Sequence, residues 1–393
     1  MRIVRTQTRL FASGFRPTFL MAGLAALTLI PAWAAVWVFG ATLGTNWRPT
    51  LWHAHELVFG FVGAAIAGFL LTAVPSWTGH RGFGGLPLII LVTVWFSGRL
   101  IVASGASWPA GVVLAVDVGF LVLLAGLLAP PLLRARNRNT PLLFVLALLA
   151  MCNIAFYWAL MRRDVSAASH SLLMAIDIAL LMVTVIGGRI LPAFTSSGLH
   201  ASGSKVTVRA WPLTAAAAIG VMVAVALVDL LWPNSRGAGV LAGIAAIIQA
   251  IRLAQWRTTA TLKQPILWVL HVAYAWLPLG LALKSAALLA GIAGSAFWLH
   301  ALTIGVLATM VFGVMTRAAL GHTGRPVIAQ PLTVAAYVLL SISGVTRVFG
   351  LSTGLNYPLV ILLSASLWTS SFAFFLWVYV PILCSPRVDG KTG

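Results

Sequence analysis

The chain has 393 residues, of which 61% are hydrophobic and only 8% are charged, whereas roughly a quarter of an ordinary soluble domain is charged. This balance excludes a water-soluble globular protein. The net charge of +19 could indicate a nucleic-acid partner, but the basic residues are scattered over short segments between apolar runs and form no polar domain. No nucleic-acid binding is therefore expected.

Apolar runs follow one another along the whole chain, and several reach the roughly 20 residues that a helix needs to cross a bilayer. Their composition is rich in Leu, Ala and Val and lacks the alternation of a membrane β-barrel, which predicts helices. The sequence thus predicts an all-α polytopic protein with one transmembrane domain over residues 1–393. The twelve expected helices span residues 18–40, 53–75, 86–104, 110–129, 141–161, 170–191, 211–231, 238–253, 265–284, 296–316, 331–350 and 358–380.

Basic residues predict how the helices are oriented. The first run follows Arg2, Arg5, Arg9 and Arg16 without a convincing cleavage site, which favours a retained helix over a signal peptide. If both termini are cytoplasmic, eighteen of the 25 basic residues, Lys391 among them, lie on the cytoplasmic side. This bias predicts that arrangement in a lipid bilayer. The seven on the opposite side are Arg48, Arg99, Arg162, Arg163, Arg236, Lys284 and Arg347.

The second, sixth and tenth predicted helices resemble one another, because each opens with histidine and ends in a polar segment that contains glycine. Three repeats of four helices, over residues 1–137, 138–260 and 261–380, are the simplest account; the alternative is chance similarity between apolar sequences. A threefold arrangement would gather the opening histidines at the extracytoplasmic side. These histidines are His53, His55, His170 and His300.

The four outer histidines are the first candidates for chemistry, although histidines at helix ends can also simply lie in the polar interface. Neutral imidazole is a common transition-metal ligand and an axial ligand of haem iron. We expect His53 and His300 to be an axial pair, because both lie in the outermost turns of their helices. His170 is the reserve haem or metal ligand. His271 is also a candidate, but it lies deeper in its own helix.

His53 and His55 cannot share a helix face, since two residues correspond to about 200° of rotation. His53 shares its predicted face with Glu56 and several small residues, so His53 is favoured as the inward ligand and His55 as the alternative. Glu56 is expected to orient an imidazole, supply a proton or ligate metal; its alternative is an interfacial carboxylate.

Other ionisable residues inside predicted helices are functional candidates because charges in a membrane usually face a cavity or a partner. Asp177 follows His170 by seven residues, and it is a candidate for a proton path or for pairing with Arg99 or Arg347. Either arginine could instead bind haem propionates. The inner histidines form a second candidate metal site, although histidines in loops are usually solvated. They are His80, His200 and His322.

The cysteines indicate no further site. Cys152 and Cys384 are far apart and lie in or beside apolar helices. The sequence therefore predicts neither a disulfide framework nor a CxxC metal site.

Several motifs resemble the NnrS family. They are Gly14-Phe15-Arg16-Pro17, Trp52-His53-Ala54-His55-Glu56, Gly187-Gly188-Arg189-Ile190-Leu191-Pro192, His271 with Tyr274 and Trp276, and the block from His300 to Pro326. The resemblance extends over essentially the whole chain. It implies a bacterial inner-membrane protein that contains haem, expected as b-type, and copper as a further candidate. It also implies a link to nitric oxide, as a candidate ligand, and to tolerance of nitrosative stress, with Tyr274 near the site or on a proton path.

Histidines on the second, sixth and tenth helices also look like the catalytic subunits of haem-copper oxidases, a likeness of fold only. Here the tenth helix has only His300 at its opening and the seventh has no histidine, so a copied dinuclear centre is not expected. Three functions remain open. They are a haem protein that protects against nitric oxide, a membrane oxidoreductase acting on nitric oxide or quinol, and a transporter or channel with a histidine-lined pathway.

Overall fold

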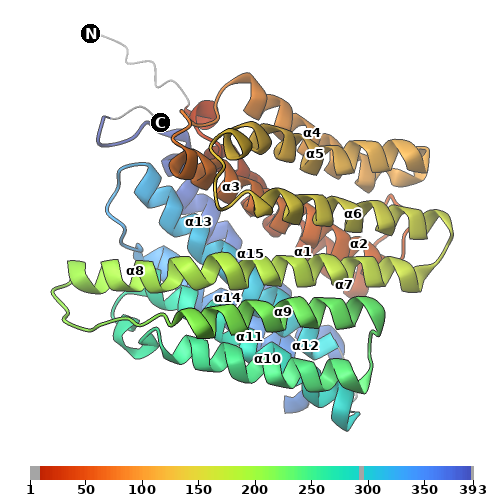
Figure 1. The fold of residues 1–393 in the computed structure, drawn as a ribbon. Helices are drawn as coiled ribbons and strands as arrows, with labels where there is room; N and C mark the ends of the chain where they lie inside the picture. Colours follow the sequence, from red (N-terminus) through yellow and green to blue (C-terminus); the bar gives the residue numbers. More distant parts are fainter. Residues whose placement is uncertain (1–8, 292–295, 391–393) are drawn as a thin grey trace. The chain divides into compact units, whose positions relative to one another are not determined.

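The computed structural model describes residues 9–291 and 296–390. In this part of the chain it contains helices and no strand (Figure 1). Twelve helical spans within it are long and apolar enough to cross a membrane, which confirms the predicted all-α polytopic fold. Arg2, Arg5 and Lys391, which the topology prediction places in the cytoplasm, lie outside the described residues.

The chain divides into two compact units. Unit 1 comprises Met1–Ala175, Met315–Val327 and Phe372–Gly393, and unit 2 comprises Ile176–Val314 and Ile328–Ser371. The divisions fall within the helices α7 (Val165–Met182), α13 (Thr309–His322) and α15 (Tyr357–Cys384). This division into two units does not test the three predicted repeats, which stay a prediction.

Unit 1 is built on neighbouring helices that pack in sequence order. α5 packs against both α4 and α6, and α1 packs against α3 (Figure 1). The second membrane span is continuous but changes its winding in the middle, where a π-helical segment joins two α-helices. The elements are η1 (Leu10–Ala12), α1 (Phe15–Phe39), α2 (Pro49–His55), η2 (Glu56–Val62), α3 (Gly63–Thr78), α4 (Leu86–Ala103), η3 (Gly105–Ser107), α5 (Ala110–Arg134) and α6 (Pro141–Met161).

In unit 2, α10 packs against both α9 and α11, and α11 packs against a second π-helical segment, η6. The short 3-10 segments η5 (Thr258–Thr261) and η7 (Gly350–Thr353) connect longer helices. The remaining elements are η4 (Val183–Gly187), α8 (Gly188–Ala201), α9 (Pro212–Leu231), α10 (Arg236–Ala254), α11 (Pro265–Ala290), α12 (Ala296–His300), η6 (Ala301–Ala308) and α14 (Pro331–Phe349).

Several spans are longer than predicted. The sixth runs over Val165–Ala201 where residues 170–191 were expected, and the tenth continues to His322. Pro192 lies inside α8, because neighbouring groups in a membrane protein can satisfy the backbone that a proline disturbs. His200 and His322 therefore lie in the last turns of helices and not in loops, while His80 follows the end of α3.

Three spans contain a π-helical segment, and they are the same three spans that the sequence pattern groups together: η2 in the second, η4 in the sixth and η6 in the tenth. A π-turn displaces the regular carbonyl pattern and is frequent at functional sites. The Trp95 indole N–H donates to the Gly60 carbonyl in η2 at 3.1 Å. Arg252 donates to the Thr184 carbonyl in η4 at 2.8 Å. The π-segments η2 and η4 thus each offer a carbonyl that a side chain of a neighbouring helix binds.

Glycines make this close approach feasible. A Cβ atom at Gly60 would meet the Arg99 guanidinium, and one at Gly188 would meet that of Arg252. In the tenth span, a Cβ atom at Gly305 would meet the Trp276 indole. The absence of a side chain at these positions lets a large neighbouring side chain lie directly on the helix backbone.

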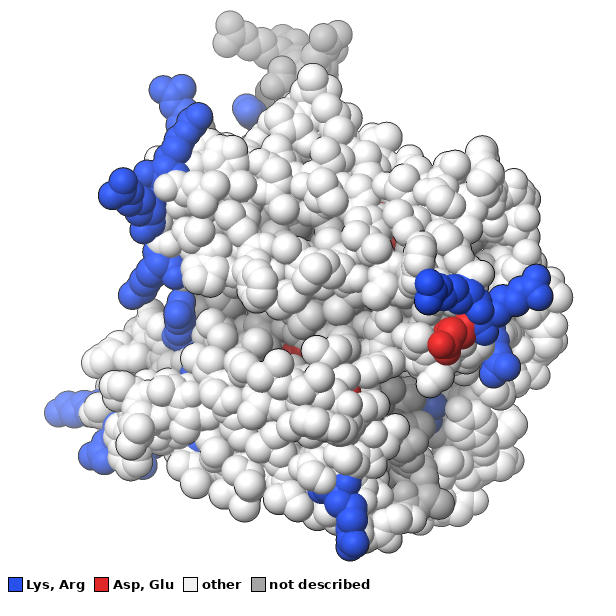
Figure 2. Space-filling model, turned by 45° about the vertical axis from the view of Figure 1, so that its right-hand side comes forward, with Lys and Arg blue, Asp and Glu red and all other residues white. Residues whose placement is uncertain are grey.

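The surface fits a lipid environment. Figure 2 shows a face on which most atoms belong to uncharged residues, while Lys and Arg stand in separate patches. Large apolar side chains are widely exposed, for example Leu213 at 82% and Trp377 at 78%. Such exposure would favour aggregation in water but is expected where lipid is the solvent. The chain is a multi-pass membrane protein.

Five of the basic residues that the topology prediction counts lie inside helices and are engaged there by other groups. They are Arg16, Arg99, Arg252, Lys284 and Arg347. Each is held by partners, as Arg16 shows: fully buried, it donates to the Leu383 carbonyl at 2.7 Å and the Ser385 carbonyl at 2.6 Å. It thereby satisfies carbonyl groups at the end of α15. If these five residues are left out of the count, most of the basic residues still lie on the predicted cytoplasmic side. The cytoplasmic placement of both termini stays a prediction.

Candidate functional site

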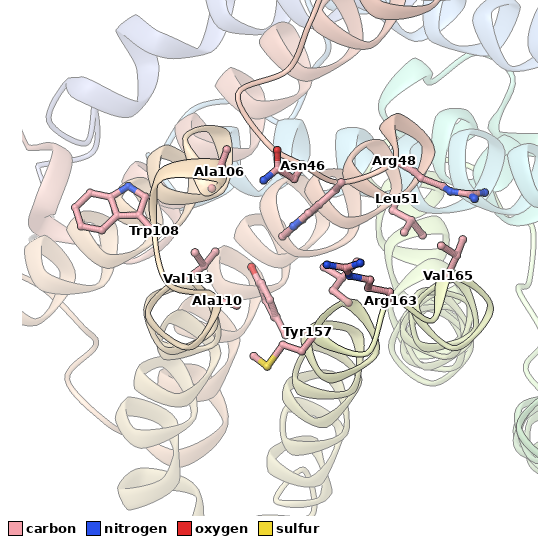
Figure 3. Close-up of a pocket in the computed structure, with 14 residues that line it drawn as sticks. Asn46, Arg48, Leu51, Ala106, Trp108, Ala110, Val113, Tyr157, Arg163 and Val165 are labelled. Carbon is pink, nitrogen blue, oxygen red and sulfur yellow. The ribbon is translucent and has the colours of Figure 1, made fainter.

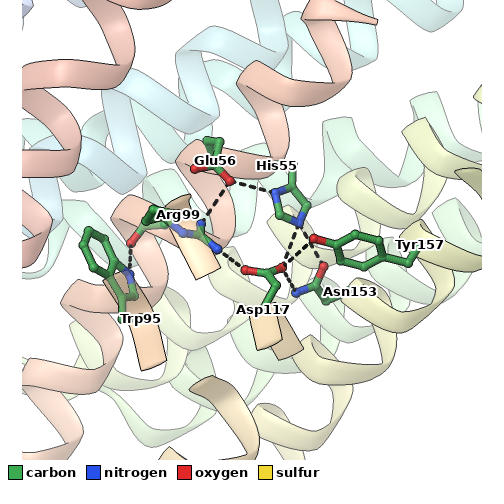
Figure 4. Close-up of polar contacts among 8 residues, drawn as sticks. His55, Glu56, Trp95, Arg99, Asp117, Asn153 and Tyr157 are labelled. Carbon is green, nitrogen blue, oxygen red and sulfur yellow. Dashed lines mark hydrogen bonds and ion pairs between the residues drawn. The ribbon is translucent and has the colours of Figure 1, made fainter. Parts of the chain in front are cut away.

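A polar network lies among the membrane-spanning helices of unit 1. It joins side chains from α2, η2, α4, α5 and α6, and Figure 4 shows them converging on one carboxyl group, that of Asp117. All are buried except Arg99, whose side chain is 13% exposed. This unit 1 network consists of His55, Glu56, Arg99, Asp117, Asn153 and Tyr157.

Hydrogen bonds and ion pairs close the network. His55 Nδ1 lies 3.1 Å from Glu56 Oε1, and His55 Nε2 lies 3.1 Å from Asp117 Oδ2. Arg99 bridges the two carboxyl groups, since its guanidinium is 3.1 Å from Glu56 Oε1 and also pairs with Asp117. The acidic groups are therefore neighbours of the same guanidinium and the same imidazole.

Asp117 has two further partners on α6. The Asn153 amide donates to Asp117 Oδ2 at 2.8 Å, and the Tyr157 hydroxyl donates to the same oxygen at 3.2 Å. A buried carboxylate is stable only where donors surround it. Asp117 meets that requirement through side chains from three other helical spans.

The charges of this network define what it can do. Glu56 and Asp117 supply two carboxylates, and Arg99 supplies one permanent positive charge. A protonated His55 would donate from both ring nitrogens and make the cluster neutral, whereas a neutral His55 leaves one excess negative charge. The network can therefore take up or release one proton at the His55 imidazole.

The structure corrects the sequence prediction about the two neighbouring histidines. His55 is fully buried, whereas His53 is half-buried and stacks on the Trp33 ring at 4.3 Å between centroids. Glu56 contacts His55 and does not follow the face assigned to His53. The prediction assumed a regular α-helix, but the π-segment begins at Glu56 and changes the side-chain directions at that point.

Sequence reasoning also missed Asp117, Asn153 and Tyr157. Asp117 carries a signal that could have found it, because the chain has only six acidic residues and this one lies inside an apolar helix. Asn153 and Tyr157 carry no comparable signal, since single polar residues are common in membrane helices.

A pocket of about 470 Å³ lies next to the network. Tyr157 belongs to both, so the pocket wall is connected to Asp117 by one hydrogen bond. Figure 3 shows the lining, which combines aromatic and basic side chains with small apolar ones and includes no histidine. The residues that define its character are Asn46, Trp47, Arg48, Trp108, Tyr157 and Arg163.

In unit 2, both ring nitrogens of His271 form hydrogen bonds with threonine hydroxyls. Its Nε2 atom lies 2.8 Å from Thr195 Oγ1, its Nδ1 atom lies 3.0 Å from Thr258 Oγ1, and the residue is 1% exposed. Both ring nitrogens are thus occupied. Tyr274 belongs to a separate set: it donates to Gln249 at 2.6 Å and accepts from Arg252 at 3.2 Å.

A second group of charges is buried in unit 2. Asp229 forms an ion pair with Lys284, and Asp177 is hydrogen-bonded to Asp229. The predicted pairing of Asp177 with Arg99 or Arg347 is therefore wrong. Arg99 belongs to the unit 1 network, and Arg347 donates to the Tyr357 hydroxyl at 3.2 Å. The sequence does not predict this role of Lys284, because it places Lys284 at the outer end of its helix. The helix continues to Ala290.

The remaining histidines differ in exposure. His53, His170 and His300 are half-buried, whereas His80, His200 and His322 are exposed. His53 and His170 belong to unit 1, and His300 belongs to unit 2. Over residues 9–291 and 296–390, no group of three or more His, Cys, Asp or Glu side chains is arranged to hold a metal ion. Cys152 and Cys384 form no disulfide in the described part of the chain.

Comparison with protein families gives a match over nearly the whole chain. The family model described as NnrS protein matches residues 9–387. Comparison with curated protein sequences gives no match.

Proposed function

The chain belongs to the NnrS family, which suggests a membrane protein linked to nitric oxide, and from this premise we propose a more specific role. The protein is a haem-binding protein of the bacterial inner membrane that acts in the response to nitric oxide and supports tolerance of nitrosative stress. The observation that carries the proposal is the family match, which includes every helical span.

The histidines differ in how well they fit an iron atom. An axial ligand must turn an imidazole nitrogen to the iron, and both nitrogens of His55 and of His271 are engaged in hydrogen bonds in fully buried surroundings. These two residues do not fit. The half-buried residues His53, His170 and His300 fit better, since each lies at or near the start of a span that contains a π-segment. His53 and His170 are the candidate haem ligands of unit 1, and His300 is the candidate of unit 2. Bound haem would supply an iron centre for nitric oxide.

Copper is the less supported cofactor. A preformed copper centre requires several histidine or thiolate ligands close together, and the described residues bring no three candidate ligands into such a group. The proposal therefore assigns no step and no residue to copper. Arg99 does not fit a role with haem propionates, because two carboxyl groups engage it. Arg347 donates to Tyr357 through one guanidinium nitrogen only, so its role with a propionate stays a prediction.

The unit 1 network supports a second candidate, a membrane oxidoreductase. A substrate that loses or gains protons, such as a quinol, would find the Tyr157 hydroxyl in the pocket wall and the Asp117 carboxyl behind it. His55 can then hold the proton between Glu56 and Asp117. Steady turnover of nitric oxide or quinol by the purified protein would favour this candidate over a binding role.

A haem and metal inventory tests the proposal. Protein purified after haem-replete expression is expected to show a Soret band that shifts on reduction and on addition of nitric oxide. His53→Ala and His300→Ala should each lower the haem content per protein several-fold by the pyridine haemochrome assay. His322→Ala is the matched control, since this exposed histidine ends its helix and its carbonyl accepts from Arg387; its haem content should equal that of the wild type.

Two outcomes would overturn the proposal. Unchanged spectra in both His53→Ala and His300→Ala would exclude these residues as ligands. A colourless wild-type protein would exclude haem and favour transport.

A further inference from the structure

Three charged side chains from three helices of unit 2 lie buried together in the membrane-spanning region. Asp177 comes from α7, Asp229 from α9 and Lys284 from α11. Asp177 and Lys284 are each 3% exposed, and Asp229 is 2% exposed. Charges at such depth are rare in membrane helices and commonly mark ion or proton sites.

The charges of this cluster do not balance if all three groups are ionised. Two carboxylates and one ammonium leave one negative charge, and an uncompensated charge is strongly disfavoured in the membrane interior. Lys284 is committed to Asp229 by an ion pair and also lies 4.9 Å from the centre of the Trp298 ring. Within the described part of the chain, Asp177 therefore has no cation of its own.

The contacts of Asp177 indicate how the balance is restored. It is hydrogen-bonded to Asp229, and a hydrogen bond between two carboxyl groups requires a proton on one of them. Its Oδ2 atom is buried and has no hydrogen-bond partner among the described residues. A protonated carboxyl that donates to Asp229 leaves only a neutral carbonyl oxygen, which tolerates such isolation better than a carboxylate oxygen does.

Other charged groups do not change this count. Asp229 and Lys284 are the charged groups that act on Asp177. α10 packs against both α9 and α11 and carries two arginines. Arg236 is the first residue of α10, and Arg252 is hydrogen-bonded to Thr184 and Tyr274. η6 and α12 pack against α11 and contribute His300 as their titratable residue. α8 and α14 also pack against α11; α8 carries Arg189 and His200, and α14 carries Arg347, which is hydrogen-bonded to Tyr357.

We propose that Asp177, Asp229 and Lys284 form a proton-binding site within the membrane, in which the two carboxyl groups share one exchangeable proton beside the lysine ammonium. Binding converts a carboxylate pair into a carboxylic acid that donates to a carboxylate, and the cluster becomes neutral. Release returns the proton to water and restores the second carboxylate. The site is independent of the proposed haem, so failure of either proposal leaves the other intact.

Infrared spectroscopy of the full-length protein in lipid nanodiscs tests the proposal. A protonated carboxyl has a carbonyl band above the amide region, and this band should shift to lower frequency in deuterated water. Labelling the aspartate carboxyl carbons with carbon-13 should also lower the frequency of the band. This shift distinguishes the five aspartates from the single glutamate, Glu56. This measurement needs no substitution and therefore does not depend on whether a variant folds.

Variants then assign the band. Asp177→Asn and Asp229→Asn should each abolish it, because the remaining carboxylate can pair with Lys284 alone. Lys284→Met should retain it at wild-type intensity or above, since removal of the cation increases the need for a proton. Asp164→Asn is the matched control, because Asp164 is exposed and bonds to the Ala167 N–H; it should leave the band unchanged.

Four results would overturn the proposal. They are a band that survives in both Asp177→Asn and Asp229→Asn, a band that is lost in Lys284→Met, and a band that does not shift in deuterated water. The fourth is a wild-type protein without the band that sodium, but not potassium, protects against thermal unfolding; that result would assign the site to a metal cation.

Discussion

The two units place the same charges in the membrane but surround them differently. Unit 1 holds Glu56 and Asp117 with Arg99, and unit 2 holds Asp177 and Asp229 with Lys284. Each therefore has two carboxyl groups and one cation. In unit 1 the guanidinium contacts both carboxyl groups, whereas in unit 2 the ammonium pairs with Asp229.

The geometry of the cation explains the difference. A guanidinium presents several N–H donors in a plane and can bridge two carboxylates, while an ammonium is a compact charge. The additional group also differs: unit 1 contains the His55 imidazole between its two acids, and unit 2 has no imidazole in its charged cluster. The excess negative charge is therefore expected to be neutralised by a proton on His55 in unit 1 and by a proton on a carboxyl group in unit 2.

The largest expected effect comes from removal of the two cations. Arg99→Met should lower the free energy of unfolding by about 3–5 kcal/mol, because both Glu56 and Asp117 lose their charged partner. Lys284→Met should cost less, about 1–3 kcal/mol, because the carboxyl pair can take up a further proton. Unfolding in mixed detergent micelles, followed by circular dichroism, measures both values.

Arg162→Met is the control for this comparison. Arg162 is exposed and stacks on the Trp158 ring at 4.7 Å, so its loss should change stability by less than about 1 kcal/mol. Equal losses in Arg99→Met and Lys284→Met would contradict the idea that the two units balance charge differently.

An intermediate effect is expected where an arginine lies on a helix backbone. Gly188→Ala places a methyl group against the Arg252 guanidinium, which donates to the Thr184 carbonyl. We expect a loss of about 1–3 kcal/mol in unfolding free energy, typical of overpacking. Gly220→Ala is the matched control, because a Cβ atom there would meet nothing within 4 Å. Its effect should be neutral or slightly stabilising by helix propensity. Similar values for both variants would refute the close packing at Gly188.

Much of the fold could be predicted because it depends on local composition. Every one of the twelve expected spans has a counterpart in the described chain, since apolar length alone decides which segments can cross lipid. Span ends were less predictable. The sixth helix continues past Gly187 and Pro192, residues that would end a helix in water but are tolerated where neighbouring helices satisfy the backbone.

The candidate site was predicted only in part, because its geometry depends on contacts between distant segments. The sequence pointed to His55 and Glu56 as polar residues at one helix start, but Asn153 reaches His55 from 98 positions further along the chain. The expectation that His53 points inward beside Glu56 was wrong, because a 3.6-residue period cannot anticipate the π-segment that begins at Glu56. Which histidine binds haem stays a prediction. The sequence made Asp177 a candidate, but it did not point to its neighbours Asp229 and Lys284.

The smallest effect is expected at the boundary between the pocket and the unit 1 network. Tyr157→Phe removes the hydroxyl that donates to Asp117 Oδ2 but keeps the aromatic ring, which packs against Trp47 at 5.6 Å between centroids. Because Asp117 retains donors from Arg99 and Asn153, the loss should be about 1 kcal/mol, the typical contribution of one hydrogen bond. The same unfolding assay measures it, with Phe156→Leu as a control that changes ring packing on His55 and leaves the hydroxyl in place. A loss for Tyr157→Phe as large as that for Arg99→Met would mean that Asp117 depends on the tyrosine hydroxyl as much as on the guanidinium, and charge balance would no longer explain the stability of unit 1.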